Sequence, residues 1–140
     1  MKHLLLIACL LVSQSAFAEF DRVAIDTIIL EAQGESLDGQ KAVGEVIRNR
    51  ALKRHQSIES VCMARKQFSC WNDHQEAKNR LKMVSGEVFQ RASRAWSESE
   101  TSNLTKGATH YHNLDVSPYW SKGKLPCVVV GKHKFYNNVR

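Results

Sequence analysis

The chain has 140 residues, which is enough for one domain with a substantial hydrophobic core but not for two. Its net charge is +6, because 20 lysine and arginine residues outnumber 14 aspartate and glutamate residues. Such an excess favours an anionic partner: a wall polymer, nucleic acid or a membrane surface. The basic residues form neither a dense block nor a patch interleaved with aromatics, which argues against nucleic acid.

The N-terminus has the features of a secretory signal peptide. Lys2 supplies a positive end, an apolar run extends from Leu4 to Val12, and the small residues of Ala16-Phe17-Ala18 fit a cleavage site. We expect residues 1–18 to be removed on secretion across the inner membrane. Residues 19–140 would then form one domain in the periplasm or outside the cell, and losing Lys2 lowers the net charge from +6 to +5.

An exported chain meets peptidoglycan rather than nucleic acid, so the wall polymer is the preferred partner. The apolar run is shorter than the ~20 residues of a membrane-spanning helix. Cys9 lies in a stretch that resembles a lipoprotein cleavage site, but almost no apolar core precedes it. We therefore expect no stable membrane anchor.

The first predicted helix of the mature chain ends in a carboxylate. Apolar residues three and four apart predict a buried stripe: Val23, Ala24, Ile28 and Ala32. Glu31 points along this stripe, and Gly34 ends the helix. A carboxyl group on an apolar face loses hydration, which favours the protonated form that a general acid needs. Glu35 follows the break and is expected nearer to water. The alternative is that Glu31 is an ordinary solvated residue at a helix end.

The second predicted helix extends from Gln40 to about Lys53. Asp38 is placed to accept hydrogen bonds from the free amides of its first turn. Five apolar residues define its buried stripe: Ala42, Val43, Val46, Ile47 and Ala51. Its other face carries four basic residues: Arg48, Arg50, Lys53 and Arg54. We expect most of these four side chains to be solvated.

A short third helix is predicted after Ser57, which can cap it. It is followed by Gln67-Phe68-Ser69-Cys70-Trp71, in which two aromatics flank small polar groups. Such a pattern can form a wall for sugars, because aromatic faces cover apolar ring surfaces while polar neighbours bind hydroxyls. Burial of both aromatics in the core is the commoner alternative.

Three cysteines remain after removal of the signal peptide: Cys62, Cys70 and Cys127. In an oxidising compartment Cys62 and Cys70 could close a short loop and leave Cys127 unpaired. Connectivity is not readable from sequence, and Cys127 is an alternative partner for either. The spacing of the three does not match a structural zinc site.

The remainder of the chain changes from helix to strand. A long helical region is predicted from about Gln75 to Ser99. Residues 107–113 alternate in the manner of a strand, and residues 127–130 and 131–136 indicate further strand structure. The expected fold is therefore α+β and predominantly helical, a single domain with a small C-terminal β region.

Two histidines would face the same side of the first predicted strand, and such a pair can bind a metal ion: His110 and His112. His74 and His133 are candidates for a third ligand, but neither has a diagnostic spacing. We prefer histidines that line a cleft and form hydrogen bonds, and we expect no metal or other cofactor.

Five motifs together resemble the SleB-type cell wall hydrolases, which include the spore-cortex-lytic enzymes. They occur in the same order over nearly the whole mature chain: Glu31-Ala32-Gln33-Gly34-Glu35, the stretch from Gly39 to Arg50, Gln67-Phe68-Ser69-Cys70, Gly107 to His112, and Gly131 to Tyr136. The resemblance implies a lysozyme-like catalytic domain that cuts peptidoglycan between N-acetylmuramic acid and N-acetylglucosamine, commonly as a lytic transglycosylase. We expect no accessory wall-binding domain like that of the spore enzymes, which favours a general wall role over spore cortex.

The resemblance also implies roles for individual residues. Glu31 would act as the catalytic acid and base. Independently of the resemblance, Glu35 is a candidate helper because it lies only four residues further on. The motif match suggests six substrate contacts: Gln67, Phe68, Ser69, His110, Tyr111 and Tyr136. A monomer is expected.

Two rival functions remain open at this point. A hydrolytic muramidase would use water in place of the muramic acid 6-hydroxyl, and a non-catalytic module would bind peptidoglycan without cutting it. An amidase or peptidase would need a zinc triad or an activated cysteine, for which the sequence offers little support.

Overall fold

The structure, a computed structural model, describes residues 21–140. The predicted signal peptide and its cleavage site after Ala18 lie outside the described residues. Within residues 21–140, none of the helices combines the length and the apolar character needed to cross a membrane.

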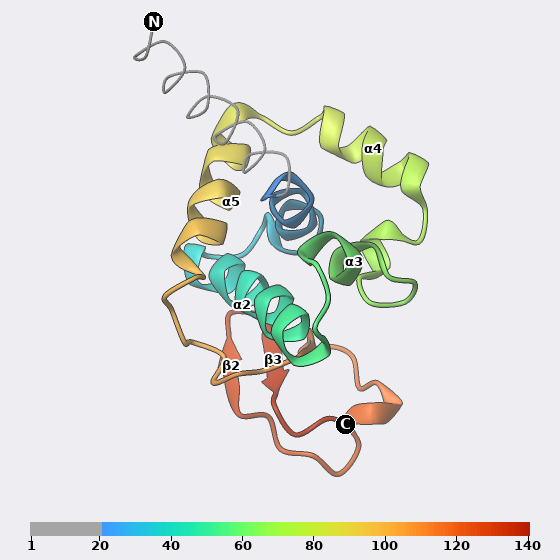
Figure 1. The fold of residues 1–140 in the computed structure, drawn as a ribbon, viewed down its shortest axis with the longest axis vertical. Coiled ribbons are helices and arrows are strands. Elements are labelled where there is room, and N and C mark those ends of the chain that lie inside the picture. Colours follow the sequence, from blue (N-terminus) through green and yellow to red (C-terminus); the bar gives the residue numbers. More distant parts are fainter. Residues whose placement is uncertain (1–20) are drawn as a thin grey trace, which may run out of the picture.

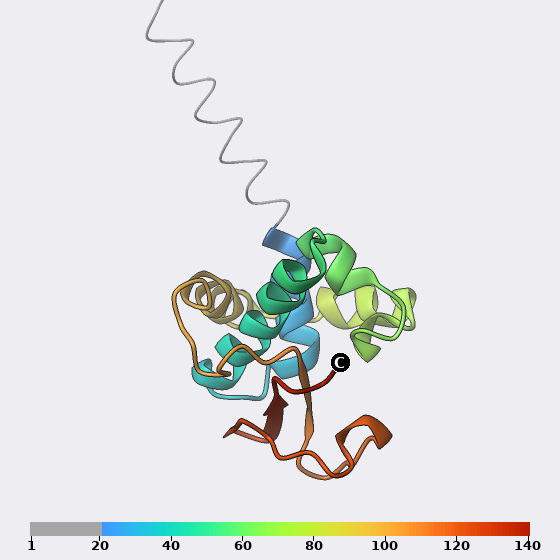
Figure 2. The same ribbon diagram turned by 60° about the horizontal axis from the view of Figure 1, so that its bottom comes forward.

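The first helix covers residues 21–32 and runs through the middle of the molecule. The other helices follow in chain order: α2 (Leu37–Arg54), α3 (Ile58–Met63), the 3-10 turn η1 (Ser69–Trp71), α4 (His74–Lys82) and α5 (Gly86–Glu98). Figures 1 and 2 show α5 on one side of the first helix and α3 with α4 on the other, while α2 packs across it. The first helix is therefore enclosed by helices on several sides.

This enclosure follows from the apolar stripe of the first helix. Ile28 and Ile29 are almost completely buried, and they share one core with Val43 and Ile47 of α2. Burying an isoleucine of this kind stabilises the fold by ~1.5–3 kcal/mol. The stripe predicted from the sequence is thus the centre of the helical core.

Side-chain caps set where the helices begin. Ser36 caps α2 by accepting a hydrogen bond from the amide of Gly39, so the prediction of Asp38 as the cap is wrong. Asp38 lies in the first turn instead, where it pairs with Lys41. Ser57 caps α3 as predicted.

The helical region predicted from about Gln75 to Ser99 consists of two helices. It is interrupted between α4 and α5, where Ser85 accepts a hydrogen bond from the amide of Val88 and starts a new helix. Serine followed by glycine is the local signal for this break, because serine favours the cap position and glycine weakens a helix interior.

The C-terminal part forms a three-stranded antiparallel sheet in the order β1-β3-β2. Its strands are β1 (His110–Asn113), β2 (Val128–Val130) and β3 (His133–Tyr136), and a second 3-10 turn, η2 (Tyr119–Ser121), lies between β1 and β2. Phe135 pairs with Tyr111 on one side and Val128 on the other. Its buried ring packs against Ala42 and Val46, so the sheet rests on α2. The predicted fold class, helical with a small C-terminal sheet, is confirmed.

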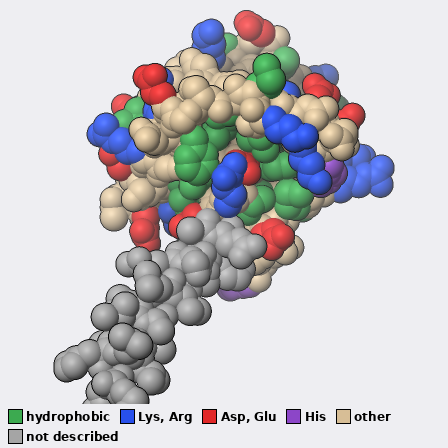
Figure 3. Space-filling model, turned by 90° about the horizontal axis from the view of Figure 1, so that it is seen from above, with side chains coloured by type: hydrophobic (Ala, Val, Ile, Leu, Met, Phe, Trp, Pro, Cys, Tyr) green, Lys and Arg blue, Asp and Glu red, His purple; other side chains and the backbone are tan. Residues whose placement is uncertain are grey.

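Charges of both signs are spread over the face shown in Figure 3. Hydrophobic side chains gather near the middle of this face; basic and acidic side chains lie both among them and around them. The excess of positive charge is therefore not concentrated on this surface.

Candidate active site

Glu31 lies at the meeting point of three segments. It occupies the last turn of the first helix, and its Oε2 accepts a hydrogen bond of 2.7 Å from the hydroxyl of Tyr111 on β1. Its Oε1 accepts a longer one, 3.3 Å, from the backbone amide of Cys70 in η1. The carboxyl group is partly buried. Helix, turn and sheet thus fix its position together.

Two cavities adjoin Glu31, and both are lined by Glu31 and Ser69. The first, of about 330 Å³, is called here the α4-side cavity and is also lined by Leu30, Cys70, Asn72, Asp73, Glu76 and Arg80. The second, of about 390 Å³, is called the sheet-side cavity and is also lined by Arg50, Lys66, Gln67, Phe68, Tyr111, His112, Asn113, Val116, Pro118, Trp120 and His133. The two cavities therefore meet at Glu31 and Ser69.

Tyr111 is a fixed hydrogen-bond donor to Glu31. Burial raises the pKa of its phenol well above the ordinary value, and the nearby Glu31 charge raises it further. Its ring stacks on Phe135 with centroids 5.5 Å apart and contacts the edge of His133 at 5.0 Å. The hydroxyl therefore stays protonated and held in place.

We expect Tyr111→Phe to lower turnover by about tenfold, since a hydrogen bond to a charged group is lost while the packed ring remains. Tyr136→Phe is the matched control, because its hydroxyl bonds His112 Nε2 and not Glu31. Initial rates of solubilisation of purified sacculi would measure both. Equal rates for Tyr111→Phe and the wild type would show that the hydrogen bond to Glu31 is dispensable.

Arg50 was expected among the solvated residues of α2 but is only 5% exposed. Its Nε donates to the carbonyl of Thr109 and its Nη1 to the carbonyl of Gln67, while the guanidinium lies over the Phe68 ring at 4.7 Å. Burial lowers its pKa to about 10, so it remains charged at neutral pH. Arg50 thus lines the sheet-side cavity and joins the backbone at Gln67 to the backbone at Thr109, a role that helical periodicity alone cannot reveal.

Arg48 also departs from the expectation of a solvated side chain. Its guanidinium lies 3.7 Å from the centroid of Trp96 and donates to Ser99 Oγ. Lys53 and Arg54 are exposed as predicted.

The predicted substrate contacts in the Gln67–Cys70 stretch differ in how accessible their side chains are. Ser69 is exposed and lines both cavities. Gln67 lines the sheet-side cavity, but its Oε1 already accepts a 2.6 Å hydrogen bond from Arg54. Phe68 is 2% exposed and covered by Arg50, and Trp71 is buried with its indole nitrogen donating to Thr27. Both rings therefore belong to the core, which confirms the commoner alternative and not the sugar wall.

Two further predicted contacts, Tyr136 and His110, lie outside both cavities. Tyr136 is buried and stacks on His112, and neither Tyr136 nor His110 lines either cavity. Instead both pack against Trp120, which lines the sheet-side cavity. Trp120 was not predicted as a site residue, because it lies two residues after Pro118 in an irregular segment without periodicity.

His110 makes the stability of the protein depend on pH. Its pKa falls to about 4 because of burial, reinforced by the positive charges of Arg50, Arg54 and Lys53. Between that value and the ordinary pKa of ~6.5, the unfolded chain binds a proton that the folded chain does not. The stabilisation is therefore complete above pH ~6.5 and is lost as the pH falls towards ~4.

We expect urea midpoints to be lower at pH ~5 than at pH ~7, and His110→Gln to narrow that difference. If the urea midpoints at the two pH values differed equally in the wild type and in His110→Gln, groups other than His110 would cause the pH dependence of stability.

Glu35 is less accessible than predicted, with a side chain that is 10% exposed. The turn between β2 and β3 covers it: Lys132 donates its amide to Oε2, and His133 Nδ1 lies 3.8 Å from Oε1. Gly131 permits this contact, since its φ is +57° and a Cβ there would lie 2.1 Å from Glu35 Oε2. Glu35 lines neither cavity beside Glu31.

The predicted link between Cys62 and Cys70 is not formed, and all three cysteines of the described residues are free. Cys62 is fully buried in the core, where burial raises the pKa of its thiol to about 11. Cys70 lies beside Glu31, and burial together with that negative charge raises its thiol pKa. Both sulfurs therefore stay protonated and have low nucleophilic reactivity.

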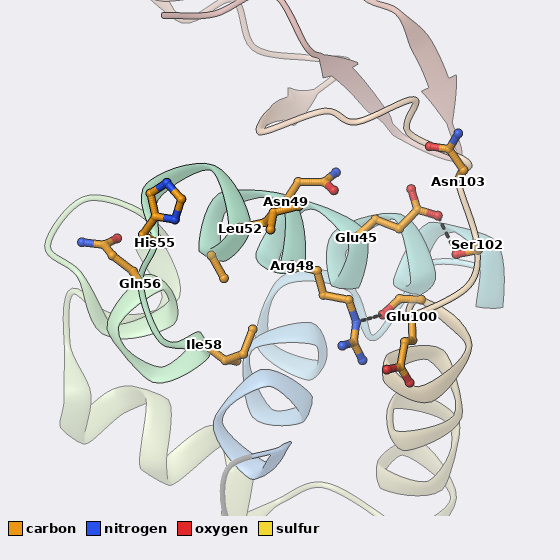
Figure 4. A pocket seen from close by; sticks show the side chains of 12 residues that line it. Glu45, Arg48, Asn49, Leu52, His55, Gln56, Ile58, Glu100, Ser102 and Asn103 are labelled. Carbon is orange, nitrogen blue, oxygen red and sulfur yellow. Dashed lines mark hydrogen bonds between the residues drawn. The ribbon is translucent and has the colours of Figure 1, made fainter.

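A separate cavity of about 520 Å³ lies between α2 and the segment after α5 (Figure 4). No predicted site residue lines it. Its buried carboxylate, Glu45, accepts hydrogen bonds from Ser102 Oγ, the Leu104 amide, and both the amide and hydroxyl of Thr105. Glu45 is fully engaged in holding this segment, so we assign it a structural role.

The two histidines of β1 are not joined by a third ligand. Across residues 21–140, no group of three or more histidine, cysteine, aspartate or glutamate side chains is arranged to hold a metal ion. His112 instead contacts the Asn113 carbonyl through Nδ1 and Tyr136 through Nε2.

The central buried helix, its surrounding helices and the small sheet define a lysozyme-like fold. The chain belongs to the Cell Wall Hydrolase family, whose model matches residues 34–136. This confirms the predicted resemblance. The match starts after Glu31, so the catalytic assignment of that residue depends on the site geometry. No curated protein shows significant similarity to the chain.

Solved structures support the same fold. The catalytic domain of the germination-specific lytic transglycosylase SleB from Bacillus anthracis is 22% identical, with a TM-score of 0.67 over 83% of this chain and 92% of that one. The catalytic domain of the Bacillus cereus SleB protein is 23% identical, with a TM-score of 0.63 over 81% of this chain and 89% of that one.

Proposed function

We propose that this protein cleaves the glycan strand of peptidoglycan as a lytic transglycosylase, with Glu31 as its acid and base. The observation that carries the proposal is a partly buried carboxyl group, held by Tyr111, between two cavities. Membership of the Cell Wall Hydrolase family supports the substrate. The Bacillus anthracis neighbour, which is described as a lytic transglycosylase, supports the reaction type.

In this mechanism, Glu31 serves twice. Its protonated carboxyl donates a proton to the oxygen between N-acetylmuramic acid and N-acetylglucosamine, and the bond from that oxygen to the muramic acid anomeric carbon breaks. The resulting carboxylate then takes the proton of the muramic acid 6-hydroxyl, whose oxygen attacks the anomeric carbon. The products are a free N-acetylglucosamine 4-hydroxyl and a 1,6-anhydro end, and Glu31 is protonated again.

The two carboxyl oxygens have unequal roles in this scheme. Oε2 is occupied by the short hydrogen bond from Tyr111, whereas the amide of Cys70 contacts Oε1 at a longer distance. We assign the transferred proton to Oε1, beside Ser69 and the cleft. Tyr111 then stabilises the carboxylate that remains after protonation of the leaving group.

Glu35 takes a positioning role in the proposal in place of the helper role expected from the sequence. Two-carboxylate glycosidases need a second carboxylate near the anomeric carbon or its attacking water. Glu35 is enclosed by the β2–β3 turn and outside both cavities. It therefore joins the end of the first helix to the sheet.

The proposal includes secretion, with cleavage after Ala18. The small residues at Ala16 and Ala18 follow an apolar core, as a signal peptidase site requires. N-terminal sequencing of exported protein should begin at Glu19. A chain that retains Met1, or that is lipidated at Cys9, would contradict this assignment.

Digestion of purified sacculi tests the reaction class. The proposal predicts soluble fragments with new glycan ends and no new amino groups from cleaved peptides. New amino groups would indicate an amidase or peptidase. Binding to sacculi without release of fragments would indicate a non-catalytic binding module.

A further inference from the structure

A further cavity adjoins the sheet-side cavity at Trp120. It measures about 560 Å³, lies between η2 and the C-terminal segment, and is called here the distal cavity; its lining residues are Tyr119, Trp120, Lys122, Lys124, Asn138, Val139 and Arg140. Figures 1 and 2 both show η2 beside the C-terminal end of the described chain. Trp120 lines the sheet-side cavity as well. The distal and sheet-side cavities are therefore neighbours that meet at Trp120.

The wall shared by these two cavities is rigid. Trp120 packs against three aromatic rings, with centroids 5.2 Å from His110, 5.6 Å from His112 and 5.2 Å from Tyr136. Tyr119, in contrast, is 86% exposed. An exposed aromatic next to a fixed one offers an apolar surface for the ring of a sugar, and the lysines beside them can bind polar groups.

The distal cavity and the α4-side cavity differ in charge. The distal cavity contains Lys122, Lys124 and Arg140 and no acidic residue. None of the three forms an ion pair with another described residue, while the Lys122 ammonium lies 5.2 Å from the Tyr119 ring. The α4-side cavity instead contains Asp73 and Glu76 besides Glu31, with Arg80 as its one cation. An anionic chain would be attracted to one side of Glu31 and not to the other.

We propose that the distal cavity is an additional binding site for carboxylate-bearing sugars of the same peptidoglycan strand. This inference rests on the proposed function, because the strand must cross Glu31 to reach past Trp120. Tyr119 and Trp120 contact the sugar ring, and Lys122 and Lys124 bind carboxylates of the muramic acid or its peptide. The site gives the enzyme a preference for long, anionic strands.

The test uses the double variant Lys122→Gln/Lys124→Gln. A matched control, Lys78→Gln/Lys82→Gln, removes the same charge from exposed positions on α4 that line none of the three cavities. Each pair is placed in the wild-type chain for kinetics and in the Glu31→Gln chain for binding. Tyr119→Ala tests the aromatic contribution separately.

We expect the distal variant to bind sacculi about threefold to tenfold more weakly than its control, as for two modest charge contacts. Binding to chitin oligomers, which lack carboxylates, should be equal in both. The distal variant should also cleave long glycan strands more slowly, while its rate on short glycan oligomers matches that of the control.

Equal binding of the distal and control variants to sacculi would overturn the proposal, as would an equal loss of rate on short and long strands. A wild-type chain that binds sacculi but cleaves neither substrate would refute the proposed function instead. In that case the binding comparison with chitin still decides whether the distal cavity recognises the anionic strand.

Discussion

Glu31→Gln is expected to lower turnover on sacculi by at least ~10²-fold, the lower end for loss of general acid catalysis. Glutamine keeps the size of the side chain and an oxygen that can accept the hydrogen bond from Tyr111, but it has no proton to transfer to the glycosidic oxygen. The stability of the fold should change little, because Glu31 is only partly buried and only the end of its side chain accepts hydrogen bonds, from Cys70 and Tyr111. Initial rates of sacculus solubilisation, with circular dichroism to confirm the fold, measure the effect.

Glu35→Gln is the control for this variant. It removes the same charge four residues further along the chain, while its amide oxygen can still accept from Lys132. We expect a clearly smaller loss of turnover than for Glu31→Gln. The reverse ranking, with folded Glu31→Gln near the wild-type rate, would mean that Glu31 is not the catalytic acid.

Glu45→Ala is expected to lower the free energy of unfolding by about 3–5 kcal/mol. Four hydrogen bonds to this 4% exposed carboxylate are lost, and the amides of Leu104 and Thr105 are left without partners inside the protein. Each unsatisfied buried group costs about 1–3 kcal/mol. Urea unfolding measures the change.

Two other variants calibrate this result. Glu100→Ala removes an exposed carboxylate from the same cavity and should change the free energy of unfolding by no more than about 0.5 kcal/mol. Glu45→Gln keeps one acceptor oxygen and should fall between the two. If Glu45→Ala unfolded like Glu100→Ala, the 102–105 segment would have to be held by other contacts.

The sequence predicted the elements whose periodicity is strong. The stripe around Ile28 and Ile47 and the run from Val128 to Val130 were read correctly, because their spacing follows from which face is buried. The break at Ser85 was missed, since apolar residues continue at helical spacing on both sides of it and the cap competes with that pattern.

For the site, local patterns were sufficient only for residues on regular elements. Glu31 and Tyr111 were predicted on a helix and a strand, and the structure brings the two side chains into contact. The burial of Arg50 depends on carbonyl groups of Gln67 and Thr109, which are distant in the sequence. The enclosure of Glu35 likewise depends on the β2–β3 turn, in which Lys132 lies 97 residues after Glu35 in the sequence. Such contacts are set by tertiary packing, which no single stretch of sequence encodes.

Digestion of purified sacculi in water enriched in oxygen-18 tests the central claim most directly. The proposed mechanism closes the muramic acid ring with its own 6-hydroxyl, so the released fragments should carry 1,6-anhydro ends without the heavy isotope. Mass spectrometry of the fragments distinguishes these ends from reducing ends, which are one water heavier. Reducing N-acetylmuramic acid ends labelled with oxygen-18 would contradict the account and identify a hydrolytic muramidase.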